Sequence, residues 1–328
     1  MRLLAIAALG LALAALPGVA SAQYSMVTDP PSRWAWGGHV AADFRMEFET
    51  ESDTGDEFDA WRSGIEGDVG GPINQSILVG MAARYAYSSF DFNLNSIPPT
   101  AYGGTRLPRD PWNTINTLDL VPHATVLVGD RVSVVTTVPI RWAAENGADR
   151  NAFAGGISAI VRWQANDDLM VGAGLGVTSQ LGRDAETFPI VALRWQINER
   201  FELKTEGDWL QGGSTALYYG PNDTVHFLVI AGYERTRFRL DDYGSARDKD
   251  GVGEITTVPL EVGLRLRFLE GAYFDFRTGL GVDGRIRVET AGGNRLYDQR
   301  YDPAWRWSMA IHVPFGGGGV RGGNDGPD

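Results

Sequence analysis

Residues 33–315 alternate between apolar and polar side chains with a period of two, over segments that often exceed ten residues. A period of two is the period of a β-strand. In the last such segment the apolar face carries Trp305, Trp307, Met309, Ile311, Val313 and Phe315. Strands in globular proteins usually run about 5–6 residues. The length of these segments therefore restricts the fold more than any other feature of the chain.

The second face of these segments carries charges of both signs along its length. In segment 272–290, acids and arginines alternate with the apolar residues. A soluble sheet buries its apolar face, whereas a membrane barrel turns its apolar face to lipid and its charged face to a polar interior. The sequence therefore predicts an all-β fold, a single antiparallel transmembrane up-and-down β-barrel. A secreted soluble β-protein is the alternative.

Turn residues divide the alternating region into strands. The predicted strands are 33–50, 58–71, 76–92, 112–128, 131–145, 152–165, 168–182, 187–197, 201–209, 214–220, 223–240, 254–269, 272–290 and 303–315. Two-residue turns such as Gly129-Asp130 and Glu270-Gly271 alternate with longer links, which predicts short periplasmic turns and longer extracellular loops. The hairpin at 201–220 is short for two spanning strands. The predicted count is therefore 12–14.

The N-terminus has the pattern of a cleaved signal peptide. Arg2 precedes an apolar run that ends at Pro17-Gly18, and Ala20-Ser21-Ala22 offers a small-residue cleavage site. We expect residues 1–22 to be the signal peptide and 23–32 a periplasmic N-terminal segment. The barrel is expected at 33–315 and a Gly-rich disordered tail at 316–328.

Composition excludes several classes of protein. The chain has no cysteine, which excludes a disulfide scaffold and a thiolate metal site. A formal net charge of −12 argues against binding to nucleic acid phosphates. No phosphate loop, dinucleotide fingerprint or zinc motif occurs, so no catalytic residue, cofactor or metal is predicted.

The charged face supplies the candidate site residues, and the tryptophans supply a candidate interface. The predicted lumen-lining residues are His39, Asp43, Arg45, Glu47, Arg265, Arg267, Asp275, Arg277, Asp283, Arg285, Arg287, Arg306 and His312. The predicted aromatic girdle consists of Trp34, Trp36, Trp61, Trp112, Trp142, Trp163, Trp195, Trp305 and Trp307.

Two groups of residues raise further possibilities for the lumen. Arg235, Arg237 and Arg239 form a basic row in the lumen if the odd-numbered face of their strand points inward, either as a structural filling or as an anion path. His39 and His312 lie near the periplasmic ends of the first and last strands. Barrel closure places them on neighbouring strands, where they bond to Arg306 or Asp43 or form a pH-sensitive or metal-binding pair.

The chain resembles the bacterial outer-membrane β-barrel superfamily in its signal peptide, alternation, girdles and aromatic strand end. Segments 188–203 (FPIVALRWQINERFEL) and 271–288 (GAYFDFRTGLGVDGRIRV) are similar to an uncharacterised barrel family of unknown function. The resemblance implies an outer-membrane location, contact with outer-membrane lipid and lipopolysaccharide, and recognition of Phe315 by the barrel-assembly machinery.

The expected function is passive. The first hypothesis is a channel or transport protein, and the second is a closed envelope-structural or ligand-binding barrel. An outer-membrane lipid hydrolase is a remote alternative, because all four histidines are predicted at the periplasmic end, away from the outer leaflet.

Overall fold

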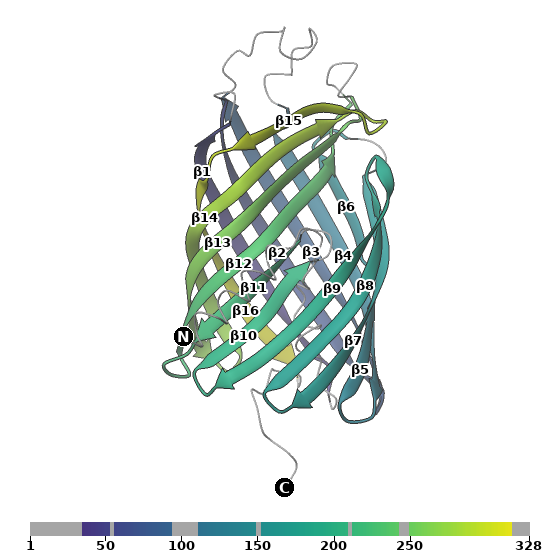
Figure 1. Ribbon diagram of the computed structural model, residues 1–328, viewed down its shortest axis with the longest axis vertical. Helices are drawn as coiled ribbons and strands as arrows, with labels where there is room; N and C mark the ends of the chain where they lie inside the picture. Colours follow the sequence, from purple (N-terminus) through teal and green to yellow (C-terminus); the bar gives the residue numbers. More distant parts are fainter. Residues whose placement is uncertain are drawn as a thin grey trace.

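The computed structural model describes residues 35–52, 56–93, 111–148, 152–208, 212–242 and 249–316. These residues form one continuous antiparallel sheet that curls into a barrel (Figure 1). The strands are β1 (Gly37–Glu51), β2 (Glu57–Asn74), β3 (Ile77–Asn93), β4 (Thr114–Val128), β5 (Val132–Thr137), β6 (Ile140–Glu145), β7 (Phe153–Asn166), β8 (Leu169–Gln180), β9 (Arg183–Asn198), β10 (Phe201–Asp208), β11 (Gly212–Tyr219), β12 (Val225–Arg239), β13 (Val252–Leu269), β14 (Ala272–Glu289), β15 (Arg295–Tyr301) and β16 (Ala304–Gly316).

The sixteen strand segments make a closed barrel of 14 strands. β5 and β6 are two halves of one barrel strand that is interrupted at Pro139, and β15 and β16 are separated in the same way before Ala304. Proline lacks the N–H that a continuous ladder needs, which accounts for the first break. The first strand pairs with the last, from Gly37↔Gly316 to Glu47↔Arg306. The predicted barrel fold is confirmed, with the larger of the two strand counts.

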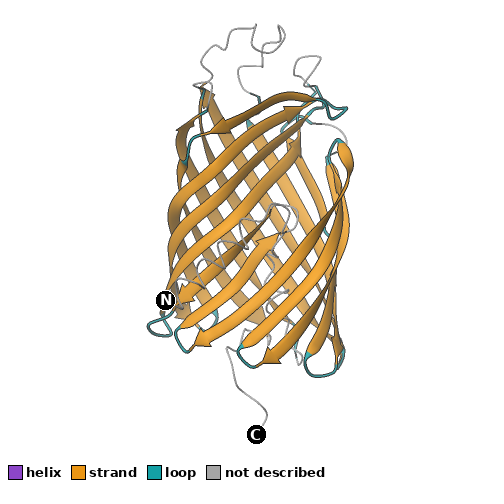
Figure 2. Ribbon diagram, viewed as in Figure 1, coloured by secondary structure: helices purple, strands orange, loops and turns teal. Residues whose placement is uncertain are grey.

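Nearly every described secondary-structure element is a strand, and the connections are short at one end and longer at the other (Figure 2). No helix in the described part of the chain is long and apolar enough to cross a membrane. The predicted signal peptide, the 23–32 segment and most of the Gly-rich tail lie outside the described residues.

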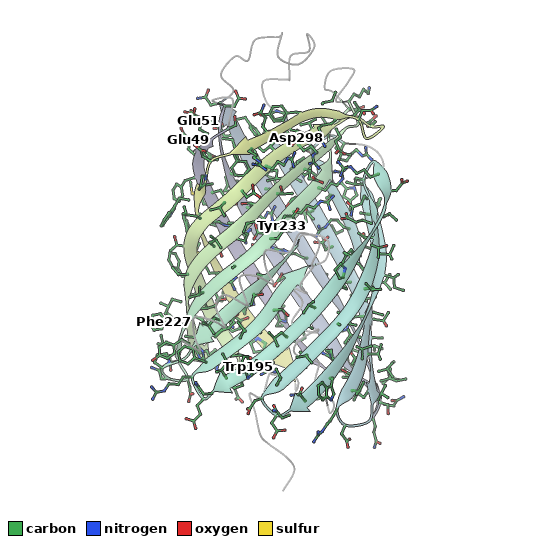
Figure 3. All side chains as sticks on the ribbon, viewed as in Figure 1. Glu49, Glu51, Trp195, Phe227, Tyr233 and Asp298 are labelled. Carbon is green, nitrogen blue, oxygen red and sulfur yellow. The ribbon has the colours of Figure 1, made fainter. Side chains whose placement is uncertain are left out.

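The outer face of the barrel carries a broad apolar belt. Its exposed members include Val40, Ile65, Met81, Leu120, Val126, Ile157, Val161, Leu175, Val229, Leu260, Val262, Met309 and Ile311. The aromatic residues Trp195 and Phe227 lie toward the end with short turns (Figure 3). The acidic residues Glu49, Glu51 and Asp298 lie at the opposite end. An apolar belt of this kind cannot be left in water, so it is the lipid-facing surface.

The predicted girdle tryptophans do not all lie on this outer face. Trp36, Trp61, Trp163 and Trp305 are exposed on it. By their pairing, Trp142, Trp195 and Trp307 are on the outer face too, because their strand partners are Leu118, Leu169 and Met46. Trp112 does not belong to the girdle, contrary to the sequence prediction, because it is buried inside the barrel with 1% of its surface exposed. Trp34 lies outside the described residues.

The interior carries most of the charged residues that alternation assigned to the lumen. By strand parity the inward residues include His39, Asp43, Arg45, Glu47, Arg265, Arg267, Asp275, Arg277, Arg306 and His312. Arg306 has no exposed surface, and Arg265 donates both its Nε and an Nη to Asp275 at 2.7 and 2.8 Å. Buried charges need such partners, because isolated ionised groups are costly away from water.

Asp283, Arg285 and Arg287 do not line the lumen, contrary to the sequence prediction. The pairing of β13 with β14 slips by one residue between Thr256 and Val258, and Asp283 has a φ of 50°. This is a β-bulge, which exchanges the two faces of every residue beyond it. Ile286 and Val288 therefore point inward, and the two arginines point out of the wall.

An apolar plug fills the interior at the extracellular end. It consists of Phe58, Phe90, Phe92, Trp112, Ile115, Phe238, Leu240, Ile286, Val288, Tyr297 and Tyr301, with smaller residues between them. Trp112 is at its centre, edge-on to Phe92 at 5.3 Å and to Phe238 at 5.0 Å between ring centroids. Such edge-to-face aromatic contacts are favourable, and the plug leaves this end of the lumen occupied by side chains.

Candidate functional site

The barrel wall is incomplete above the short hairpin formed by β10 and β11. β11 pairs with β12 from Tyr219↔Phe227 up to Gly212↔Glu234. β10 pairs with β9 only from Phe201 to Lys204, whose partner is Arg194. Among the described strands, none pairs with the remainder of β9, residues 183–193, on this side. Figure 1 shows β9 and β12 diverging above the hairpin.

The open edge of β9 lacks one of its backbone donors. The N–H of Leu193 points toward β10, because it donates to Oγ1 of Thr205 at 3.0 Å, whereas the N–H of Gln196 points toward β8. Because backbone groups alternate along a strand, the N–H groups of Val191 and Thr187 point to the open side. The backbone of Pro189, which lies between them, faces the same side. Proline has no N–H, and prolines are characteristic of strand edges that remain unpaired.

At the extracellular end the wall overlaps itself instead of closing edge to edge. Arg239 at the end of β12 pairs in parallel with Ala144 of β6, so β12 bends inside the tips of β8 and β9. Glu186, on the inward face of β9, accepts a hydrogen bond from Arg235 on the outward face of β12 at 2.9 Å. The structure corrects the idea of a luminal row of Arg235, Arg237 and Arg239: these residues face out of β12.

A lateral cleft remains between the two overlapping layers. Its cavity of about 660 Å³ is lined by Gln180, Gly182, Arg183, Asp184, Ala185, Glu186, Tyr233, Arg235, Glu254, Thr256, Arg285, Arg287, Gly292 and Gly293. Tyr233 marks the lower rim of this lateral cleft in the front wall (Figure 3). The volume is in the range of small-molecule sites.

Ion pairs hold the inner layer of the lateral cleft. Glu254 receives hydrogen bonds from Arg237 and Arg287, each at 2.8 Å, and from Arg235 at 3.0 Å. Arg237 also bonds Glu289, at 2.5 Å, and Arg183 from the β9 tip pairs with the same glutamate. Glu254 and Glu289 are 4% and 1% exposed. Their compensation by several guanidinium groups is what permits such burial.

Below the apolar plug, a layer of charges in the interior links β1, β16, β13 and β12. Arg306 of β16 lies 2.8 Å from Glu261, 3.0 Å from Glu234 and 3.5 Å from Glu47. Arg45 reaches the same Glu234 at 2.9 Å. The residual cavity beside this layer is about 40 Å³, enough for a few water molecules. In the described part of the chain, the apolar plug and this charge layer thus occupy successive levels of the interior.

The inner wall beneath the lateral cleft is apolar. Phe188, Ile190 and Ala192 of β9 pack with Ile160 and Met170 on the inward face. The ring of Phe188 lies over Gly176, where an added Cβ would stand 2.3 Å from the ring. Gly176 thus makes room on β8 for the Phe188 ring of β9, and Gly174 makes room for Ile160 of β7. This part of the inward face is therefore a buried apolar patch close to the charged cleft.

A closed antiparallel barrel of 14 strands, with an apolar outer belt and a charged interior, defines a transmembrane β-barrel. No family model matches the chain, and no curated protein matches it. The fold of the described residues is therefore that of an outer-membrane type of β-barrel.

Several solved outer-membrane barrels have a similar overall shape. An outer membrane channel from Pseudomonas putida F1 has 10% sequence identity and a TM-score of 0.45, and the match covers 88% of this chain and 98% of the other. A Pseudomonas aeruginosa FadL homologue has 14% identity and a TM-score of 0.45, over 93% and 96% of the two chains. The Pseudomonas putida toluene transporter TodX has 9% identity and a TM-score of 0.44, over 92% and 97%.

Sequence reasoning singled out Arg235, Arg285 and Arg287 but placed them in the lumen, and it missed the other residues of the lateral cleft and one further cluster. All four histidines lie in the periplasmic half of the interior, and the rings of His39 and His312 are 6.1 Å apart. The partner of His39 is Asp68, at 2.5 Å from Nδ1, instead of the expected Arg306 or Asp43. The even-numbered polar residues of strand 58–71 gave a signal for Asp68 and Glu66, since β2 must adjoin β1.

Proposed function

We propose that this protein is a passive transport barrel that exchanges small, largely apolar molecules between its lumen and the surroundings through the lateral cleft. The proposal rests on the gap between β9 and β12 above the hairpin of β10 and β11, where the two strands do not pair with each other and β9 has no described partner on the facing side. The apolar plug and the charge layer around Arg306 obstruct the axial route, while the wall opens at the side. The buried apolar patch around Phe188 and Ile190 lies beside the cleft and would give an apolar solute an apolar neighbour.

The proposal includes no catalysis. The histidines that could serve as general bases are at the opposite end of the barrel from the lateral cleft. The side chains that line the cleft offer arginine, carboxylate, glutamine, threonine and tyrosine groups. Two of its carboxylates, Glu186 and Glu254, accept hydrogen bonds from Arg235 and Arg237, so their oxygens are engaged with guanidinium groups.

Closing the lateral cleft covalently tests the transport route. Because the chain has no cysteine, Glu186→Cys and Arg235→Cys introduce a unique pair across the opening, which a flexible bis-maleimide can bridge. The matched control pairs Glu186→Cys with Thr178→Cys, which face each other across β8 and β9 and leave the opening free. Uptake of the apolar fluorophore N-phenyl-1-naphthylamine by cells that express each variant is the measurement.

We expect cross-linking across the cleft to reduce uptake to the level of cells without the barrel, while the cross-linked control keeps its uptake. Unchanged uptake after bridging Glu186→Cys to Arg235→Cys would mean that solutes take an axial route. If the wild-type barrel gives no uptake above background, the closed structural barrel is the better description.

We also propose that the chain reaches the membrane by export and assembly steps encoded at its ends. Residues 1–22 have the pattern of a cleaved signal peptide, which makes Gln23 the mature N-terminus. Phe315 is 44% exposed at the end of the closing strand, where the assembly machinery can contact it. Mass spectrometry of the purified protein tests the cleavage, and outer-membrane yield of Phe315→Ala tests the assembly signal.

A further inference from the structure

Three potential metal ligands converge at the periplasmic end of the interior, where the first and last strands close the barrel. They are His39 on β1, Glu66 on β2 and His312 on β16. Ala41 of β1 pairs with His312 on one side and with Glu66 on the other. His312, Ala41 and Glu66 therefore form one row across three strands. His39 is two positions along β1, on the same inward face.

The small side chain between the ligands lets them meet. Ala41 is 2% exposed, and its methyl group leaves the space above it to the longer side chains on either side. One ligand atom from each of His39, Glu66 and His312 lies within 4.8 Å of the others. Ligand atoms bound at about 2.0–2.2 Å to one tetrahedral zinc ion stand roughly 3.3–3.6 Å apart. Small side-chain rotations close that difference.

A second carboxylate orients one of these ligands. Asp68, which pairs with His39 across β1 and β2, lies 2.5 Å from Nδ1 of the ring and also accepts the backbone N–H of His39 at 3.0 Å. Nε2 of His39 is thereby left to coordinate. Metal-binding histidines commonly use their second nitrogen in this way, which fixes the ring and raises its basicity.

The surrounding charges leave the cluster suited to a cation. Arg84 is 3.9 Å from Glu66, but it makes its closer contact, 3.1 Å, with Asp43. Arg265 and Arg277 both bond Asp275, so their charge is matched within that group. The ring of His312 stacks on Tyr273 at 4.3 Å between centroids, which holds it over the seam.

The geometry points to a divalent transition-metal site of the zinc class, formed by His39, His312 and Glu66 with Asp68 as the outer partner of His39. Two imidazoles and one carboxylate suit Zn²⁺ and exclude a preference for Ca²⁺ or Mg²⁺, which take oxygen ligands. A bound ion links the first, second and last strands across the seam of the barrel. This inference is independent of transport through the lateral cleft.

Zinc binding by the full chain, folded in detergent and made without a histidine tag, tests the site. Titration against a chromophoric chelator gives the stoichiometry and affinity for Zn²⁺, and Co²⁺ absorption reports coordination by nitrogen and oxygen. The variants are His39→Ala, His312→Ala, Glu66→Gln and Asp68→Asn. His226→Ala is the matched control, since His226 is also at the periplasmic end of the interior but outside the cluster.

We expect one Zn²⁺ per chain for the wild type and for His226→Ala. Loss of either ligand histidine lowers the affinity by at least about 100-fold, and Asp68→Asn lowers it by about 10-fold or more. Migration on unboiled gels confirms that each variant is folded. The site is disproved if the folded wild type takes up no Zn²⁺ at 100-fold excess, or if the cluster variants and His226→Ala bind it equally.

Discussion

The cost of a charge on the outer face depends on its depth in the membrane, and β13 offers a graded test. Its outward residues from Val258 to Phe268 are apolar, whereas Thr256 and Glu254 above them are polar. Ten residue steps at about 3.3 Å, tilted by about 40°, give a belt of roughly 25 Å, the height expected for a barrel of this type. Val262 is near the centre of the belt, and Leu269 is at its periplasmic edge.

Val262→Arg is therefore expected to destabilise the barrel by about 2–4 kcal/mol, and Leu269→Arg by about 0–1 kcal/mol. Both native side chains are well exposed, at 56% and 69%, so neither change creates a cavity or an overpacked core. Tryptophan fluorescence during urea titrations in liposomes measures the two free energies of unfolding.

The difference of at least about 1 kcal/mol corresponds to a change of about fivefold or more in the folding equilibrium. Equal costs at the two positions would refute the placement of the belt along β13. A larger cost for Leu269→Arg than for Val262→Arg would refute it as well, since that order reverses the depth.

Three further substitutions probe the interior and the bulge. Arg306→Met leaves buried carboxylates without their shared partner, so the same titration should show a loss of about 3–5 kcal/mol in the free energy of unfolding. A loss below about 1 kcal/mol would show that the charges of this layer do not depend on one another. Trp112→Ala removes the centre of the apolar plug and should lower the free energy of unfolding by about 3–5 kcal/mol. It should also add conductance steps in planar bilayers that the wild type lacks. Absence of new steps would mean that the plug is not the axial barrier. Asp283→Val forces a β-branched residue to a φ of 50° and should cost about 1–2 kcal/mol while Asp283→Asn costs little, and equal effects would exclude the left-handed conformation.

Strand alternation predicted most of the barrel because lipid imposes it. Residues such as Val262 and Ile311 must face hydrocarbon, so their neighbours face the interior, and the strand ranges follow. Closure also follows from the sequence, since an open edge in lipid is costly; it placed His39 beside His312.

The extracellular third of the barrel reverses this pattern, which is where the sequence prediction fails. Beyond the membrane the outer face meets water, so Arg285 and Arg287 turn outward while Ile286 and Val288 join the apolar plug. In β14 the reversal occurs through the bulge at Asp283, a shift of one residue that alternation alone does not reveal.

The lateral cleft could not be derived from alternation either. The arginines of β12 and the carboxylate of Glu186 belong to strands that are not paired with each other, and they meet only because β12 bends beneath the tip of β9. The short hairpin at 201–220 was the one local indication, since it is too short to fill the wall between its neighbours.

Amide hydrogen exchange along β9, in lipid nanodiscs, tests the opening in the wall most directly. The amides of Thr187 and Val191 point to the open side, whereas the amide of Leu193 has the same orientation but is bonded to Thr205. We predict that Thr187 and Val191 exchange at least 100-fold faster than Leu193. Equal protection of all three amides would show that β9 is paired along its whole length and would contradict the lateral cleft.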